Sequence, residues 1–140
     1  MLNKAKCFFV AIVLEKIIPT LIFGLLFVVR YIKFYEIKGI RLTNGWGAPS
    51  HHKLAFLISI IMFLAGVWLK WGNRLIHLIL QITPIVVMLN CERLYFDFCD
   101  YRLEHVVIGC RLYLVLSVIL LFYCILITLI SKKPMRENRI

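Results

Sequence analysis

The chain has 140 residues, of which 62% are apolar, and its mean hydropathy is +0.90. Soluble globular domains are closer to half apolar, so this composition argues against a soluble helical bundle and indicates an integral membrane protein. The formal net charge is +10. The basic residues flank the apolar runs, which suits anionic lipid headgroups and gives no reason to expect a nucleic acid partner.

Four apolar runs predict four antiparallel transmembrane helices in a single all-α domain, over residues 7–29, 54–69, 75–90 and 106–130. The middle two runs give only about 24 Å of helix each, so they need flanking residues to cross a hydrocarbon core of about 30 Å. Between the runs lie two larger loops, 30–53 and 91–105, and a short link, 70–74. The tail is 131–140.

Lysine and arginine resist translocation, so their distribution predicts the orientation. The N-terminus, the short link and the tail together carry eight of these residues, and the two larger loops carry seven over a longer stretch. We therefore expect cytoplasmic N- and C-termini in a bacterial inner membrane, with both larger loops outside.

The two outer loops leave their local structure open. In 30–53 the basic residues could lie on one side of a helix that continues the first span, whereas Ile32, Ile37 and Ile40 favour extended chain. In 93–98 side chains alternate in polarity, as in a short strand. Paired with the first loop, this strand would form a small extended cap outside the membrane. A helical extension of the fourth span explains the same residues.

Ionisable residues interrupt the first span, where a charge in hydrocarbon costs at least a few kcal/mol and marks a candidate site. Glu15 and Lys16 are followed by Pro19, which has no amide hydrogen to bond the Glu15 carbonyl. At a similar depth the third span carries His77 and Gln81. We expect an intramembrane polar cluster of Glu15, Lys16, His77 and Gln81, beside helix kinks at Pro19 and Pro84.

A purely structural interpretation covers the same residues. Lys16 would extend to the cytoplasmic interface, Glu15 would pair locally, and the polar side chains would serve helix association. Near the outer edge, Arg111 is expected to reach Glu104 or the outer headgroups.

Five cysteines and four histidines were considered as reactive or ligating groups. If the second outer loop is a hairpin in an oxidising compartment, Cys91 and Cys99 could form a disulfide. A helix would instead separate them by about 12 Å, beyond the reach of about 7 Å. Three histidines on the outer side could contribute to a metal site, but no ligand spacing is diagnostic, so none is predicted; they are His51, His52 and His105.

The segment VAIVLEKIIPT, residues 10–20, resembles the opening helix of small multidrug transporters, in which one glutamate interrupts a short apolar run. The resemblance implies transport through four-helix dimers, with Glu15 as the essential carboxylate. Those transporters lack the adjacent lysine and carry aromatic and glycine patterns in later helices that this chain does not show. The chain is therefore not assigned to that family.

No catalytic or cofactor motif is present, so we expect a noncatalytic small membrane subunit that forms a homo-oligomer, binds another membrane-associated protein, or does both. Abundant isoleucine and lysine suggest AT-rich coding DNA and a bacterial role in phage defence, toxin immunity or entry exclusion. One alternative is a small ion- or proton-coupled transporter or channel using Glu15. Another is a metal- or thiol-active membrane oxidoreductase.

Overall fold

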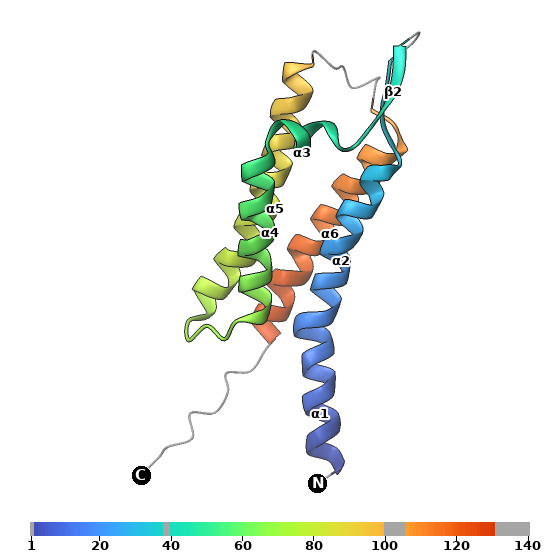
Figure 1. Cartoon of the computed structure of the whole chain (residues 1–140). Coiled ribbons are helices and arrows are strands. Elements are labelled where there is room, and N and C mark those ends of the chain that lie inside the picture. Colours follow the sequence, from blue (N-terminus) through green and yellow to red (C-terminus); the bar gives the residue numbers. More distant parts are fainter. Residues whose placement is uncertain (1, 38–39, 100–105, 131–140) are drawn as a thin grey trace.

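The computed structural model describes residues 2–37, 40–99 and 106–130. Figure 1 shows long helices side by side, with a β-hairpin at one end and the start of α1 and the end of α6 toward the other. In chain order the elements are α1 (Leu2–Ile12), the π-helical turn η1 (Val13–Ile17), α2 (Ile18–Val28), the 3-10 turn η2 (Val29–Tyr31), β1 (Lys33–Ile37), β2 (Ile40–Asn44), α3 (Gly47–His51), α4 (Lys53–Trp68), α5 (Arg74–Phe98) and α6 (Ile108–Ile130).

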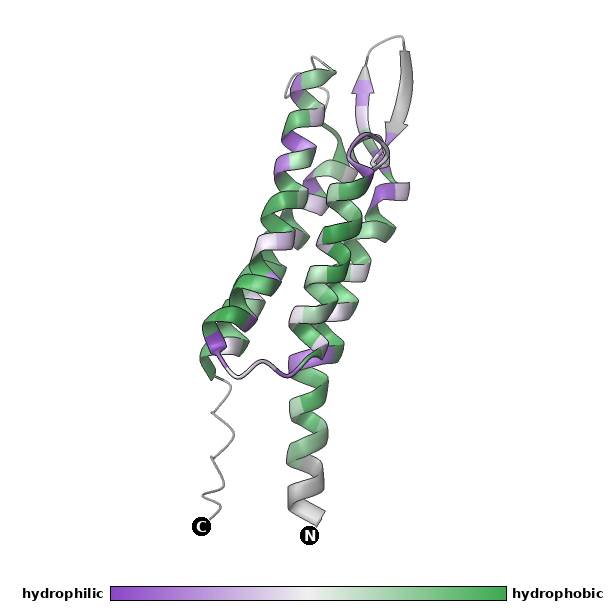
Figure 2. Cartoon of the chain, turned by 60° about the vertical axis from the view of Figure 1, so that its left-hand side comes forward, coloured by the Kyte–Doolittle hydropathy of each residue, from purple (hydrophilic) through white to green (hydrophobic). Residues whose placement is uncertain are grey.

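Among the described residues, three helical stretches are long and apolar enough to cross a membrane: Cys7–Tyr31, Arg74–Phe98 and Ile108–Ile130. The fourth apolar helix, α4, is shorter, with 16 residues. Figure 2 shows apolar residues along the helices and polar residues gathered near their ends. The architecture is therefore compatible with the predicted all-α integral membrane protein.

The core of the bundle forms where one face of each helix turns inward. Phe23 of α2 stacks on Phe63 of α4, with ring centroids 4.0 Å apart. Gly66 lets α4 approach α5 closely, since a Cβ atom there would lie 2.9 Å from the Cβ atom of Leu80. Helices in lipid associate largely through such close packing, because the surrounding acyl chains are as apolar as the helices themselves.

The first outer loop combines both of the alternatives left open by its sequence. The first helix continues only as far as η2, and the chain then forms an antiparallel hairpin in which Lys33 pairs with Asn44. The two residues just before α6 join this hairpin: Val106 forms a bridge with Tyr35, and the Val107 N–H donates to the Phe34 carbonyl at 3.1 Å. The extended cap therefore draws on Val106, not on residues 93–98.

Residues 93–98 are helical, because α5 runs without a break to Phe98. The predicted strand is wrong, and the helical alternative is also corrected, since the residues extend the third apolar helix instead of the fourth. The helix thus continues beyond residue 90, where the predicted span ends. Cys91 and Cys99 sit on this helix and at its C-cap, and both are free thiols. About two helical turns place them about 12 Å apart, beyond the reach of about 7 Å, and the hairpin that the possible disulfide requires is replaced here by a helix.

Candidate functional site

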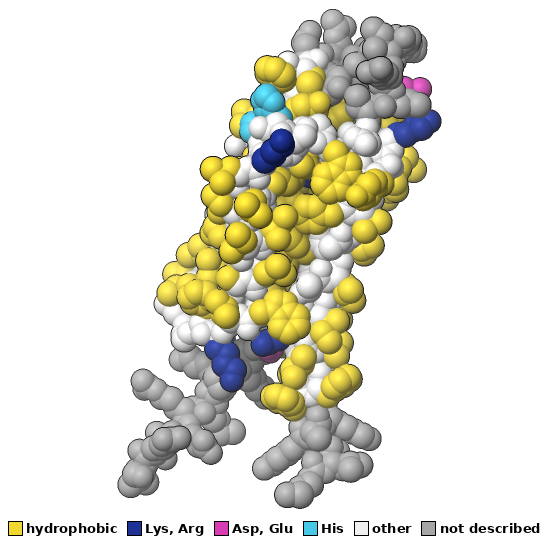
Figure 3. All heavy atoms as spheres, viewed as in Figure 1, with side chains coloured by type: hydrophobic (Ala, Val, Ile, Leu, Met, Phe, Trp, Pro, Cys, Tyr) yellow, Lys and Arg dark blue, Asp and Glu magenta, His cyan; other side chains and the backbone are white. Residues whose placement is uncertain are grey.

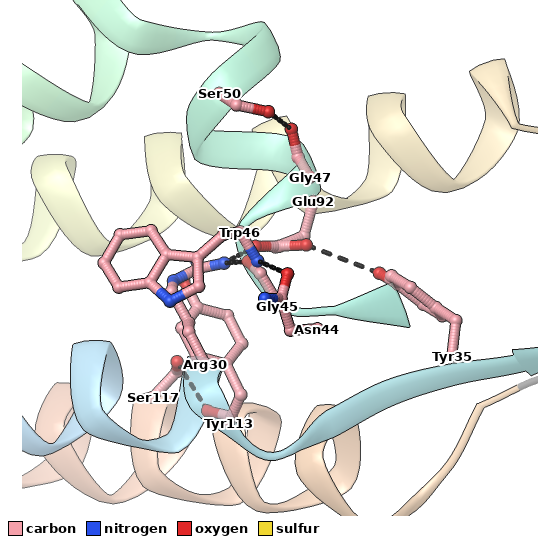
Figure 4. Close-up of polar contacts among 10 residues, drawn as sticks. All are labelled: Arg30, Tyr35, Asn44, Gly45, Trp46, Gly47, Ser50, Glu92, Tyr113 and Ser117. Atoms are coloured by element: carbon pink, nitrogen blue, oxygen red, sulfur yellow. Dashed lines mark hydrogen bonds and ion pairs between the residues drawn. The ribbon is translucent and has the colours of Figure 1, made fainter. Parts of the chain in front are cut away.

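The most deeply buried charge of the described residues is Arg30, in the turn η2 at the end of the first helix. Its Nη1 atom forms an ion pair with Glu92 of α5 and donates a hydrogen bond to the Gly45 carbonyl at 2.5 Å. The Gly45 N–H donates in return to the Arg30 carbonyl at 2.8 Å. Figure 4 shows Arg30 reaching both partners. The side chain thus joins the hairpin to the third apolar helix.

Three aromatic rings from different elements surround the guanidinium group. Its central carbon lies 4.4 Å from the ring centroid of Tyr113, 4.9 Å from that of Phe56 and 5.7 Å from that of Phe34. Aromatic faces attract a cation, and the attraction grows when water is excluded. The Nε and Nη2 atoms have no hydrogen-bond partner within the described part of the chain, so these rings provide their surroundings.

Glu92 is also buried, and it receives a second contact from the hairpin. The Tyr35 hydroxyl donates to its Oε2 atom at 3.4 Å, a long hydrogen bond. Burial and the neighbouring Glu92 carboxylate raise the pKa of Tyr35 above its usual value, so the phenol stays protonated as a donor. We call Arg30, Tyr35, Gly45, Glu92 and Tyr113 the Arg30 cluster.

Because the Arg30 cluster draws on η2, β1, the Gly45 turn, α5 and α6, it holds one end of the bundle together. Its charges are paired and enclosed, and its cation already faces a carboxylate. This arrangement suits a fixed structural connection between helices and hairpin. Neither Arg30 nor Glu92 was among the predicted site residues, since both were assigned to outer loops.

The predicted intramembrane residues lie toward the other end of the bundle. Lys16 extends to the end of α4, where its Nζ atom lies 3.4 Å from the Trp68 carbonyl oxygen and 5.5 Å from the Trp68 ring centroid. Cations are favoured at helix C-termini, where carbonyl groups lack helical donors. Glu15 instead lines a groove between the first helix and α6.

The predicted partners from the third helix lie close to each other. The Gln81 Nε2 and His77 Nε2 atoms are 3.2 Å apart, and Gln81 is fully buried. The structure thus brings His77 and Gln81 together on α5, whereas Glu15 lines the groove toward α6 and Lys16 faces α4.

Both prolines lie within helical segments, Pro84 inside α5 and Pro19 at the start of α2. Pro19 follows the π-turn, in which the Ile18 N–H bonds the Val13 carbonyl. The Leu14 carbonyl is left without a helical donor, because Pro19 has no N–H. The Tyr123 hydroxyl of α6 fills this place at 2.6 Å. The sequence predicted that the Glu15 carbonyl would lack a helical donor, and the structure shows that the Leu14 carbonyl lacks one as well.

His51 and His52, near the hairpin end of the bundle, contact aromatic side chains. The His51 ring stacks on Phe98 at 4.9 Å, and it lies 4.8 Å from the His52 ring. Within residues 2–37, 40–99 and 106–130, no three histidine, cysteine or acidic side chains are grouped to hold a metal ion. His105 and Glu104 lie outside the described residues, as does the predicted contact between Glu104 and Arg111.

No family model, curated protein or solved structure matches this chain.

Proposed function

We propose that the chain is a noncatalytic, four-span membrane subunit that self-assembles through its first helix. In this arrangement α4 is the fourth span. Its 16 residues give about 24 Å, and the adjoining helix α3 supplies part of the missing length. Hydrophobic side chains cover the middle of the face shown in Figure 3, and lysine and arginine lie near both ends, as a bilayer requires.

The observation that carries self-assembly is an open groove of about 390 Å³ beside the first helix. The principal contact of α1 within the chain is the adjoining turn η1, and Figures 1 and 2 show α1 extending beyond the ends of the other helices. This groove is lined by one face of the first helix and by two residues of α6. The residues of the first helix are Cys7, Val10, Ala11, Leu14 and Glu15, and those of α6 are Ile127 and Ile130.

The first helix of a second copy fits this groove. Cys7 and Ala11 are four residues apart on the lining face, and small side chains at that spacing let two helices approach closely in lipid. In a symmetric dimer the same face meets itself, so residues near the axis lie next to their own counterparts. We therefore place Cys7 beside Cys7 of the second copy.

Oxidative cross-linking of Cys7 in intact membranes tests this arrangement. Cys7 is an exposed free thiol, so mild oxidation with copper phenanthroline should give a covalent dimer of two 16.4-kDa chains. The dimer should disappear in Cys7→Ser and persist in the matched control Cys99→Ser, because Cys99 lies at the end of α5. A dimer that depends on Cys99, or no dimer through Cys7, would contradict the proposal.

The biological setting is part of the same proposal. The isoleucine and lysine usage suggests a bacterial inner membrane and a role in phage defence, toxin immunity or entry exclusion, and the distribution of lysine and arginine suggests cytoplasmic termini. A Cys7 cross-link to a different membrane protein would identify the partner in place of a second copy.

A small transporter is the second candidate, because Glu15 combines two features. It lies in a π-turn, and it lines the groove. Such turns are frequent at functional sites, and an ionisable side chain within a membrane span is a candidate for ion or proton transfer.

Proton uptake into liposomes separates this candidate from the subunit. With a trapped pH-sensitive dye and a potassium diffusion potential, a transporter should acidify the lumen faster than empty liposomes, and Glu15→Gln should return the rate to that background. Asp97→Asn, which removes an exposed carboxylate at the far end of α5, should leave the rate unchanged. Equal rates for the wild type and Glu15→Gln would rule Glu15 out as the proton carrier.

A further inference from the structure

A second groove, of about 450 Å³, lies at the hairpin end of the bundle between β1 and the start of α6. One wall is formed by Lys33 and Glu36 of the hairpin, and the other by residues 106–108 and Arg111. The walls are joined by the bridge between Tyr35 and Val106 and by the bond from the Val107 N–H to the Phe34 carbonyl. The groove is thus a fixed part of the fold.

The charges in this groove favour an anion. Lys33 and Arg111 come from opposite walls, both are exposed, and neither has an ion pair within the described residues. Glu36 is the one carboxylate among the lining residues, so the cations outnumber it by two to one. A ligand with a single negative charge would complement the groove.

The position of Arg111 indicates where that anion comes from. Arg111 lies in the first turn of an apolar, 23-residue helix, about 5 Å along the helix axis from its start. A guanidinium group is costly in hydrocarbon, but at this depth a long side chain reaches the layer of lipid phosphates. Lys33 lies on the hairpin side of the same layer.

An apolar track leads from the groove along α6 toward the membrane interior. Ile108, Leu112 and Val115 are exposed at 64%, 40% and 56%, and their spacing of four and three residues places them on one helix face. Free phosphate would contact only the two basic side chains, whereas a phospholipid would contact those side chains with its phosphate and the apolar face of α6 with an acyl chain.

We propose that this groove binds an anionic glycerophospholipid, with its phosphate between Lys33 and Arg111 and an acyl chain along Ile108, Leu112 and Val115. The site is separate from the groove beside the first helix and does not depend on self-assembly. Because two basic residues near a membrane surface each strengthen anionic lipid binding by a few-fold, we expect phosphatidylglycerol to be retained about tenfold better than phosphatidylcholine.

Native mass spectrometry of detergent-solubilised protein, mixed with equal amounts of the two lipids, tests the proposal. The preference should fall to about onefold in K33Q/R111Q and persist in the matched double variant K53Q/R93Q. The control removes the same charge from exposed residues near the same end that do not line the groove. Thermal unfolding of each variant in detergent should show that both are folded.

Three results would overturn the assignment. The wild type could show no preference between the lipids, or K53Q/R93Q could lose the preference as fully as K33Q/R111Q, which would indicate only the overall charge. Displacement of phosphatidylglycerol by millimolar inorganic phosphate would identify a free phosphate site in place of a lipid site. Retention of the lipid under that competition supports the proposal.

Discussion

Replacing Glu92 by glutamine is expected to lower the free energy of unfolding by about 3–5 kcal/mol, the usual cost of leaving one partner of a buried ion pair without the other. In the folded chain the Arg30 guanidinium is fully buried and would keep its charge without a carboxylate. Unfolding in mixed micelles with increasing sodium dodecyl sulfate, followed by circular dichroism, measures the difference.

The exposed pair on α5 is the matched control. Arg93 and Asp97 lie 4.0 Å apart with side chains 76% and 63% exposed, so Asp97→Asn should change stability by less than about 1 kcal/mol. The double variant R30M/E92L should be more stable than E92Q, because it removes both charges and leaves no unpaired ion. A double variant as unstable as E92Q, or less stable, would show that the pairing of the charges is not what matters.

Replacing Gly109 by alanine is expected to destabilise the chain by about 1–3 kcal/mol, the usual effect of adding volume to a packed contact. A Cβ atom at this position would collide with the Lys33 carbonyl oxygen of β1, a backbone atom that cannot turn aside. The start of α6 and the hairpin would have to separate, which would also disturb the bridge between Tyr35 and Val106.

Gly24→Ala in α2 is the matched control for this substitution. A Cβ atom at Gly24 meets nothing within 4 Å, so alanine should be neutral or should stabilise the helix by up to about 1 kcal/mol. The same micelle titration measures both variants. If the two alanine variants had equal stability, the close contact between Gly109 and the hairpin would not be required for packing.

The Arg30 cluster shows how much of the site was present in the sequence pattern. The buried positions Pro19, Phe23, Leu26 and Arg30 are separated by four, three and four residues, which is one face of a continuous helix. The same spacing places Glu92 on a buried face of α5, following the positions Gln81, Ile85 and Met88. Once the helices are extended to their true ends, periodicity alone turns both charges inward.

The boundary of α5 prevented that inference. Ending the span at residue 90 assigned Glu92 to a loop, and the alternation of polarity in 93–98 suggested a strand. A short run of alternating side chains does not distinguish a strand from a helix whose exposed end carries mixed residues. In the structure Arg93 and Asp97 face outward from the same helix, four residues apart.

The intramembrane cluster was predicted from polar residues at matching depths. In the structure His77 contacts Gln81, whereas Glu15 lines the groove toward α6. The sequence allowed Lys16 to extend toward a membrane interface, but its contact with the Trp68 carbonyl depends on where α4 ends against the first helix. The π-turn was also missed. It leaves the Leu14 carbonyl without a helical donor, and the hydroxyl that replaces this donor, from Tyr123 of α6, lies 109 residues away in the sequence.

The sequence by itself determined that this chain has long apolar helices, because runs of about twenty apolar residues suit lipid and little else. It also located the charges that interrupt those runs. Only the tertiary structure decided which enclosed charges meet, since Arg30 and Glu92 are 62 residues apart and belong to different helical segments. Burial of an ion pair is a property of that packing, and no local pattern specifies the partner.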